Sequence, residues 1–309
     1  MKICECNLHF YELPMVHSSE PRRGILLSLK NEERQCGWGE IAPLPGWSRE
    51  TFQEAYNQLQ GIHFLDCDFG KFEEMDLYPS VAFGIESALA SLKQPLVDLS
   101  PLPLSALLMG NANEILKKAD LIIKQGYKTA KLKVGQLSIE EAFDIVSELK
   151  DKMLLRIDVN RAWTLEQSVK FFSHFSKTDF DYVEEPVDNI EDLIHFEYPF
   201  AMDESLRETS VDFFLQFEHL KAFIFKPTLS GGFSECLKMK KSGKDIVLSS
   251  AFESGVGIYH IASFIERLSL PKLPLGLDTY RFLQKDILET PLDFSTSCLI
   301  LPSTINVKT

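Results

Sequence analysis

The chain has 309 residues, of which 45% are apolar and 25% charged; this composition is typical of a folded globular protein and excludes global disorder. With 32 basic against 45 acidic residues, the formal charge is -13, which makes nucleic acid an unfavourable partner. No run approaches the roughly 20 apolar residues of a membrane-spanning helix, and the first residues lack the apolar core of a signal peptide. We therefore expect a cytoplasmic protein without a membrane contact.

The N-terminal part, residues 1–98, predicts a small α+β domain. Residues 24–29 alternate in a way that favours a strand, and the stretch 36–46 is rich in the Gly, Pro and Trp of turns. Apolar residues recur at helical spacing over 48–60 and 80–92. These patterns indicate a small antiparallel sheet with helices packed on it.

A different pattern follows, in which a short apolar run, a polar turn and a helix-like segment repeat about every 20 to 27 residues, typical of a (β/α)8-type barrel. A doubly wound sheet is the alternative. The eight predicted strands are 102–108, 129–134, 154–159, 181–185, 200–203, 222–226, 246–250 and 275–277. The clearest predicted helices are 138–150, 164–175, 210–218, 232–241 and 256–268. We assign residues 99–290 to the barrel and expect 291–309 to return to the N-terminal domain.

A charged residue stands near the end of each of five successive runs. These residues are Lys133, Asp158, Glu184, Asp203 and Lys226. Any one of them alone is more often a helix cap or a turn residue. Because the carboxyl ends of barrel strands meet at one mouth, five in phase with the repeat predict a ring of charged groups in a single active site.

The residue types in this ring suggest metal-assisted proton abstraction. Lys131 and Lys133 lie two apart, so both point to the same face of their strand and need nearby negative charge if that face is buried. Three carboxylates that converge without a cation repel one another, and an all-oxygen site favours Mg²⁺, with Mn²⁺ as a substitute. A lysine beside such an ion and a second ammonium is shifted toward its neutral form and can serve as a base. The arrangement suits removal of a proton α to a metal-bound carboxylate, through an enediolate.

These residues resemble the enolase superfamily and its muconate-lactonizing subgroup, and further segments resemble the o-succinylbenzoate synthases within it. The segments that carry the closer resemblance are 38–46, 79–84, 161–164, 205–208, 226–231 and 276–279. The resemblance implies a modified (β/α)8 barrel with an N-terminal α+β capping domain. It also implies a lyase of menaquinone biosynthesis, which dehydrates 2-succinyl-6-hydroxy-2,4-cyclohexadiene-1-carboxylate to 2-succinylbenzoate by Mg²⁺-dependent syn elimination.

The resemblance also implies roles for individual residues. The magnesium ligands are three carboxylates: Asp158, Glu184 and Asp203. The catalytic groups are three lysines: Lys133 as general base, Lys226 as electrostatic stabiliser of the intermediate, and Lys131 as the group that positions Lys133 and lowers its pKa. Two further residues, Asn160 and Glu185, orient the ligands. Ser249 and Ser250 are expected to bind substrate, as is Arg23 if the stretch 17–24 is a loop that closes the mouth; the alternative for this stretch is an exposed turn. Arg156 shares a face with Asp158, and we expect it to pair with substrate or with an acid behind the ligands.

Two other readings stay open from the sequence. An N-succinylamino acid racemase or dipeptide epimerase of the same superfamily uses the same ring, with Lys133 and Lys226 as a two-base pair. A non-catalytic barrel keeps the ring only as buried ion pairs or as a ligand-binding pocket. The substrate is a small-molecule carboxylate in the first two readings, and the sequence does not distinguish a monomer from a homo-oligomer.

Overall fold

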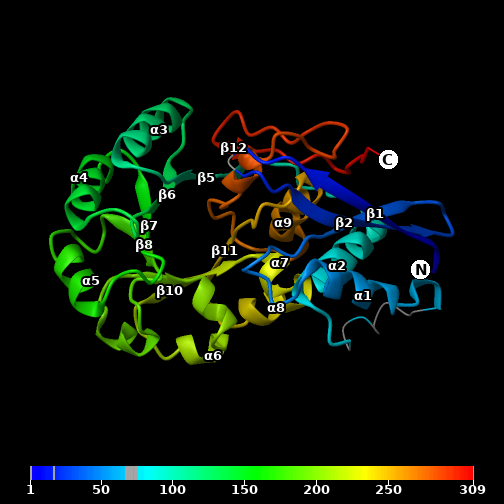
Figure 1. Cartoon of the computed structure of the whole chain (residues 1–309), viewed down its shortest axis with the longest axis horizontal. Helices are drawn as coiled ribbons and strands as arrows, with labels where there is room; N and C mark the ends of the chain where they lie inside the picture. Colours follow the sequence, from blue (N-terminus) through cyan, green and yellow to red (C-terminus); the bar gives the residue numbers. More distant parts are fainter. Residues whose placement is uncertain (1, 17, 67–71, 73–74, 309) are drawn as a thin grey trace.

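The computed structural model describes residues 2–16, 18–66, 72 and 75–308 of the chain (Figure 1). Its N-terminal part is an antiparallel sheet in the order β1-β2-β3, covered by helix α2. The elements of this part are β1 (Ile3–Leu13), β2 (Arg22–Asn31), β3 (Cys36–Ile41), α1 (Phe52–Gln60), the 3-10 helix η1 (Phe64–Asp66) and α2 (Pro79–Lys93). The predicted antiparallel sheet with helices packed on it is therefore present.

The helix and the sheet of this domain approach each other closely because of two glycines. A Cβ atom on Gly39 of β3 would lie only 1.8 Å from the carbonyl oxygen of Gly84 in α2. A Cβ on Gly84 would in turn lie 2.5 Å from the side chain of Ile41. Since neither position has room for a side chain, these glycines fix the distance between α2 and β3 and so the place of the intervening residue, Glu40.

The rest of the chain forms a parallel sheet of seven strands that curls into a barrel, in the order β11-β10-β9-β8-β7-β6-β5. The strands are β5 (Ser105–Leu108), β6 (Thr129–Lys133), β7 (Leu154–Asp158), β8 (Phe180–Glu184), β9 (Phe200–Met202), β10 (Leu220–Phe225) and β11 (Asp245–Leu248). The eighth predicted run joins the two edges by single parallel bridges, Leu275 to Leu104 and Gly276 to Ser249. The predicted barrel is confirmed.

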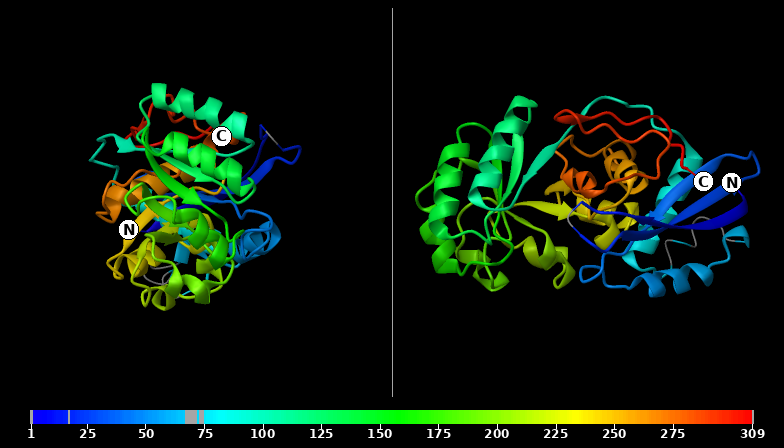
Figure 2. Two further views of the ribbon diagram at one scale, coloured as in Figure 1. Left: turned by 90° about the vertical axis from the view of Figure 1, so that its left-hand side faces the viewer. Right: turned by 45° about the horizontal axis from the view of Figure 1, so that its top comes forward.

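Helices cover the outside of the sheet, with α3, α4 and α5 along one side and the N-terminal domain against α7, α8 and α9 on the other (Figures 1 and 2). The helices are α3 (Ala112–Lys124), α4 (Ile139–Leu149), α5 (Leu165–Phe172), α6 (Val211–Phe214), α7 (Pro227–Ser230), α8 (Phe233–Lys240) and α9 (Gly255–Arg267). Three 3-10 helices are also present: η3 (Ile190–His195), η4 (Glu204–Arg207) and η5 (Asp278–Phe282). The helix predicted over 210–218 is shorter than expected, since the turn from Phe214 to Phe217 is closed by a bond three residues apart.

The C-terminal segment lies against the entry to the barrel. Strand β12 (Cys298–Leu299) pairs antiparallel with β4 (Leu102–Pro103), and the amide of Leu96 donates to the carbonyl oxygen of Ser303 at 3.0 Å. The division at residues 98 and 290 stays a prediction. Across the described ranges, no helix is both long and apolar enough to cross a bilayer.

Candidate active site

The register of the barrel strands places the predicted ring in one layer. Lys133 on β6 lies beside Asp158 on β7, and Asp158 lies beside Glu184 on β8. Each is the last residue of its strand, and because the strands are parallel all three stand at the same end of the barrel. Asp203 follows β9 directly, and Lys226 follows β10. The sequence prediction that these five residues meet at one mouth is thereby realised in the fold.

Two lysines share one carboxylate at the centre of this layer. The Oδ2 atom of Asp158 lies 2.8 Å from Nζ of Lys131 and 2.9 Å from Nζ of Lys133. Lys131 also reaches Oε1 of Glu184 at 2.6 Å, and Lys133 donates to Oδ1 of Asn160 at 2.8 Å. Burial opposes the charge of Lys131, but the carboxylates around it raise its pKa well above the ordinary value. Lys131 is therefore a cation that bridges the carboxylates of Asp158 and Glu184.

A cluster of three carboxylates lies next to these lysines. Oxygen atoms of Glu184, Asp203 and Glu204 all lie within 4.8 Å of one another. Glu184 is fully buried, and its Oε2 accepts no hydrogen bond from the described residues. Burial raises the pKa of Glu184 well above its ordinary value, against the opposing charge of Lys131. An unpartnered, buried carboxylate oxygen beside two other carboxylates is suited to a hard cation, which would hold the group in its charged form.

Lys226 stands across the barrel from Lys133. Lys226 pairs with Oδ2 of Asp203 and its side chain is 15% exposed. Strands β6 and β10 are four positions apart in the sheet order, which is half the circumference of an eight-stranded barrel. Lys133 and Lys226 therefore approach the centre of the mouth from opposite walls.

Glu185 holds the loop that carries Asp203. Its Oε1 accepts the amide N–H groups of Asp203 and Ser205, both at 2.8 Å, and its Oε2 accepts the Ser205 hydroxyl at 2.6 Å. Burial, with the charge of Glu204, raises the pKa of Glu185 to about 7. Its backbone has a positive φ of 44°, which is rare for a residue of this type and turns the chain sharply after β8. Glu185 thus fixes the backbone that carries Asp203, and its role in orienting the metal ligands stays a prediction.

Asn160 occupies a similar corner after β7. Its φ is 51°, a conformation that Asn tolerates better than most residues, and its amide N–H donates to Oδ1 of Asp158 at 3.0 Å. The side-chain amide faces Lys133 through oxygen and Glu204 through nitrogen, the latter at 3.5 Å. Asn160 therefore links the lysine side of the mouth to the carboxylate cluster.

A cavity of about 440 Å³ opens above this layer. All three lysines line it, together with the hydroxyl-bearing residues at the ends of β11 and the eighth run. Apolar side chains from both domains form its rim: Met15, Leu44, Trp47, Met109, Leu229, Phe252 and Phe282. Ser249 and Ser250 lie in the wall, as the resemblance implies. A small anionic molecule with an apolar body fits this combination of cationic floor and apolar rim.

The structure corrects the expectation for Arg156. This residue shares a face with Asp158 but lies two residues earlier in β7, in the layer below, and it is absent from the residues that line the cavity. Its Nε donates to Asp181 at 2.8 Å and its Nη1 to the carbonyl oxygen of Pro274 at 2.6 Å, and its guanidinium lies over the ring of Tyr182. Arg156 therefore pairs in register with Lys131, but its guanidinium turns away from the cavity, toward the starts of the strands.

Arg23 is corrected in the same way, because its side chain points to the solvent side of the N-terminal sheet. It is 59% exposed and pairs with Glu12 at 2.8 Å. The neighbouring Arg22 is buried and donates to backbone carbonyls, including that of Phe252 at 3.1 Å. Met15 and Ser18 are the residues of this loop that line the cavity, while His17 lies outside the described residues.

Several residues of the site carry no predicted role from the sequence. Glu204 directly follows Asp203 but has no role among the sequence predictions. Glu40 of β3 accepts the amides of Ser254 and Gly257, at 2.9 and 2.7 Å, and so binds the N-terminus of α9. Thr279 contacts Ser250 and lines the cavity. The signal available in each case was a segment of resemblance whose individual residues were not assigned.

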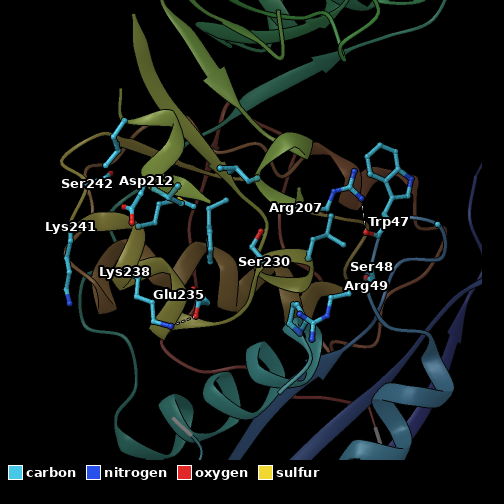
Figure 3. Close-up of a pocket in the computed structure, with 18 residues that line it drawn as sticks. Trp47, Ser48, Arg49, Arg207, Asp212, Ser230, Glu235, Lys238, Lys241 and Ser242 are labelled. Carbon is cyan, nitrogen blue, oxygen red and sulfur yellow. Dashed lines mark hydrogen bonds and ion pairs between the residues drawn. The ribbon is translucent and has the colours of Figure 1, made fainter. Parts of the chain in front are cut away.

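A second cavity of about 830 Å³ lies next to the first and is shown in Figure 3. Trp47 and Leu229 line both. The guanidinium of Arg207 lies 5.0 Å from the centroid of the Trp47 ring, and Nη1 donates to the Trp47 carbonyl oxygen at 2.8 Å. A residue at the end of η4, four positions after Asp203, therefore fixes a wall that the N-terminal domain contributes.

Comparisons with known proteins agree with this architecture. A family model described as MenC, N-terminal domain, matches residues 6–92, and one described as enolase C-terminal domain-like matches residues 114–305. The o-succinylbenzoate synthase of Escherichia coli K12 is 34% identical over 278 residues, covering 85% of this chain and 84% of the relative. That of Haemophilus influenzae is 34% identical over 313 residues, covering 91% and 92%.

Solved structures show the same fold. The o-succinylbenzoate synthase of Thermosynechococcus elongatus BP-1, solved with magnesium in its active site, gives a TM-score of 0.77 at 24% identity, covering 92% of this chain and 95% of that one. The L-Ala-D/L-Glu epimerase of Bacillus subtilis gives 0.83 at 19% identity, covering 99% of each. From the sequence relatives and the two domain models together, the chain belongs to the o-succinylbenzoate synthase family of the enolase superfamily.

Proposed function

We propose that the chain is a Mg²⁺-dependent o-succinylbenzoate synthase, which dehydrates 2-succinyl-6-hydroxy-2,4-cyclohexadiene-1-carboxylate to 2-succinylbenzoate in menaquinone biosynthesis. The observation that carries the proposal is the pair of lysines from opposite walls of the barrel beside a buried carboxylate cluster. The sequence relatives over most of the chain support the same reaction. The apolar rim and cationic floor of the cavity suit a ring that carries two carboxylates.

The donor set fits magnesium. Its members are carboxylates, which are the ligands Mg²⁺ prefers, and one of their buried oxygens is unpartnered among the described residues. The resemblance assigns the ion to Asp158, Glu184 and Asp203. The carboxylates whose oxygens lie within 4.8 Å of one another are Glu184, Asp203 and Glu204, so Glu204 would be a further ligand, while Asp158 pairs with Lys131 and Lys133. The bound ion would supply positive charge for the substrate carboxylate and for the enediolate that forms from it. Manganese, which also favours oxygen ligands, is expected to substitute.

Lys133 is the general base in this proposal. As a neutral amine it takes the proton from the carbon α to the ring carboxylate. The same ammonium then returns that proton to the departing hydroxyl, which leaves as water on the same face, and the ring becomes aromatic. Asn160 and Asp158 fix the position of Nζ for both transfers. One group with two roles explains why syn elimination needs only one acid–base residue.

Lys226 and Lys131 have supporting roles. Lys226, on the far wall, faces the opposite side of the substrate, where its positive charge stabilises the anionic intermediate. Lys131 neutralises Asp158 and Glu184 in the layer that carries Lys133, and so keeps these carboxylates in place before the ion binds. The apolar rim excludes water from the reacting carbon.

The direct test is an ultraviolet assay of the purified protein with the cyclohexadiene substrate, first with Mg²⁺ and then after EDTA. We expect aromatisation with Mg²⁺, loss of turnover with EDTA, and recovery when Mg²⁺ or Mn²⁺ is added back. A folded, magnesium-loaded protein that leaves the substrate unchanged contradicts the proposal.

A racemase or epimerase is the second candidate, because two lysines on opposite walls can also remove and return a proton on either face of one carbon. N-succinylamino acids or dipeptides in deuterated water test it by exchange at the α-carbon. Exchange and racemisation that exceed the dehydration rate would make this the main activity, whereas dehydration alone excludes it.

A further inference from the structure

The eighth run of the barrel is bonded to its neighbours through its backbone and through side chains at the mouth. Leu275 exchanges backbone hydrogen bonds with Pro103 and Ser105 on one side, and Gly276 with Leu248 and Ser250 on the other. Beyond them, Asp278 Oδ2 accepts the amide of Leu107 at 3.0 Å, and Thr279 Oγ1 accepts the amide of Phe252 at 3.2 Å. The two residues after this short run therefore join it to β5 on one side and to the loop after β11 on the other.

Thr279 also meets a hydroxyl that faces the cavity. Its Oγ1 lies 2.5 Å from Oγ of Ser250, and both residues line the cavity. Ser250 Oγ lies 3.2 Å from the carbonyl oxygen of Gly276, an acceptor that Ser249 also uses at 3.1 Å. Four oxygens, three of hydroxyls and one of a carbonyl, thus share the three hydroxyl protons of Ser249, Ser250 and Thr279.

The count of protons gives a direction to this network. A hydroxyl has one proton, and a carbonyl oxygen can only accept. When Ser250 donates to Gly276, the proton between the two hydroxyl oxygens has to come from Thr279. Thr279 already accepts from Phe252, so its own proton is free to go to Ser250. A hydroxyl that receives a hydrogen bond is a stronger donor through its own proton.

We propose that Thr279 is a positioning residue for substrate binding: it donates to Ser250 and thereby holds the Ser250 hydroxyl as a preorganised donor for a substrate carboxylate. The inference rests on the proposed function, in which Ser250 contacts the substrate. When a carboxylate enters, the Ser250 proton turns from the weak bond with Gly276 to the anion, while Thr279 keeps the oxygen in place. The contact is made by ground state and transition state alike, so its loss affects KM more than kcat.

The loop that bears Ser250 needs such a restraint because of its backbone. Phe252 has a φ of 64°, a conformation that costs energy for an aromatic residue and persists only when its surroundings fix it. Thr279 bonds the Phe252 amide and the Ser250 hydroxyl at once. One side chain therefore sets both the turn and the direction of the donor within it.

The test compares four variants of the full chain: Thr279→Val, Thr279→Ser, Ser250→Ala and the double variant Thr279→Val/Ser250→Ala. Valine keeps the shape of threonine without its hydroxyl, and serine keeps the hydroxyl. We expect Thr279→Val to raise KM for the cyclohexadiene substrate about tenfold with kcat changed by less than about twofold. Thr279→Ser is expected to restore KM to near the wild-type value.

The double variant separates positioning from a general effect on the loop. If Thr279 acts through Ser250, adding Thr279→Val to Ser250→Ala produces no further rise in KM. Independent, multiplying effects of the two substitutions would show that Thr279 only supports the loop, and would overturn the inference. So would a Thr279→Val enzyme with wild-type KM.

Failure of the inference is distinguishable from failure of the proposed function. Wild-type protein without dehydratase activity refutes the proposed function, and with it the substrate contact on which Thr279 acts. Active wild-type protein whose Thr279→Val variant is unaltered refutes only the role of Thr279. Thermal melts of all four variants show whether each one folds. If Thr279→Val does not fold, Thr279→Ala replaces it in the single and the double variant.

Discussion

The two ends of the barrel both contain charged side chains, but the charges are paired at one end and only partly paired at the other. At the closed end, Arg156, Asp181 and Lys221 form a chain of ion pairs, with distances of 2.8 and 2.5 Å. Arg156 and Lys221 also donate to backbone carbonyls. At the mouth, Glu184 and Glu204 each retain a buried oxygen that no described residue partners. At the closed end the charged groups therefore pair with one another and with backbone carbonyls, whereas at the mouth two carboxylate oxygens next to a cavity have no hydrogen-bond partner among the described residues.

The difference arises from strand register. At the closed end, β8 and β10 each contain one extra residue, Asp181 and Lys221, which the pairing skips. Such bulges turn a side chain away from its regular face, and here the two extra residues meet. At the mouth the pairing is regular, and each strand end delivers one charged group to the same layer. The paired charges at the closed end stabilise the fold, whereas the carboxylates without hydrogen-bond partners at the mouth are available to bind an ion.

The largest expected effect comes from removing the base at the mouth. Lys133→Ala is expected to lower turnover by at least about 10³-fold, because the other amine on that strand, Lys131, is held as a cation by Asp158 and Glu184. Steady-state assays check the rate, and thermal melts are expected to show little change in stability. Lys133→Arg is the matched control: it keeps the positive charge but cannot become a neutral base. An active Lys133→Arg enzyme would assign Lys133 an electrostatic role only.

The carboxylate cluster gives the next largest effect. Asp203→Asn is expected to weaken Mg²⁺ binding at least about tenfold in calorimetry, since it removes charge from the donor set. Glu204→Gln is the informative companion. A loss of affinity comparable to that of Asp203→Asn would make Glu204 a ligand in its own right, and a small loss would leave it as a support for the others. Unchanged affinity in Asp203→Asn contradicts its assignment as a ligand.

Breaking the closed end is expected to change stability and leave activity intact. Asp181→Asn removes the shared partner of Arg156 and Lys221 and is expected to cost about 2 kcal/mol in the free energy of unfolding. Chemical denaturation measures the loss, and kcat of the folded variant at low temperature is expected to match wild type. A variant with normal stability but impaired turnover would reverse the contrast between the two ends.

The same variant has a signature in pH. Burial raises the pKa of Asp181, but the charges of Arg156 and Lys221 outweigh it and lower the pKa below the ordinary 3.8. The carboxylate therefore contributes stability at pH above that value, and the contribution is lost as the pH falls through the lowered pKa. We expect the stability gap between wild type and Asp181→Asn to be constant near neutral pH and to narrow in acid. A gap that does not depend on pH contradicts the ion-pair account.

The smallest expected effect concerns the wall between the two cavities. Arg207→Gln removes the cation above the Trp47 ring but retains a donor for its carbonyl oxygen, and we expect KM to rise by no more than about threefold. Arg207→Lys keeps the charge and is the control. An effect of tenfold or more on kcat would show that Arg207 acts on the catalytic layer and not through Trp47.

The residues at the mouth were predictable from the sequence because one charged residue recurs at the end of each strand of the βα repeat, and the carboxyl ends of barrel strands lie together. The closed end was not. Arg156 has the face of Asp158 and pairs in register with Lys131, so alternation alone could not show that its guanidinium turns away from the cavity toward Asp181. The bulge at Asp181 leaves no mark in the hydrophobic pattern. Arg23 was misplaced for a related reason, since the neighbouring Arg22, and not Arg23, turns inward.

The buried contact between Glu40 and the start of α9 also restricts how this protein can be recombined. Glu40 belongs to the N-terminal domain, yet it satisfies amides at the beginning of the helix that follows the substrate loop. If the barrel were joined to a foreign N-terminal domain, the amides of Ser254 and Gly257 would lose their acceptor unless the new domain placed a carboxylate where Glu40 lies. The two domains therefore have to be exchanged as a matched pair, and a chimera that transplants only one of them would lose the shape of its binding loop before any catalytic residue had changed.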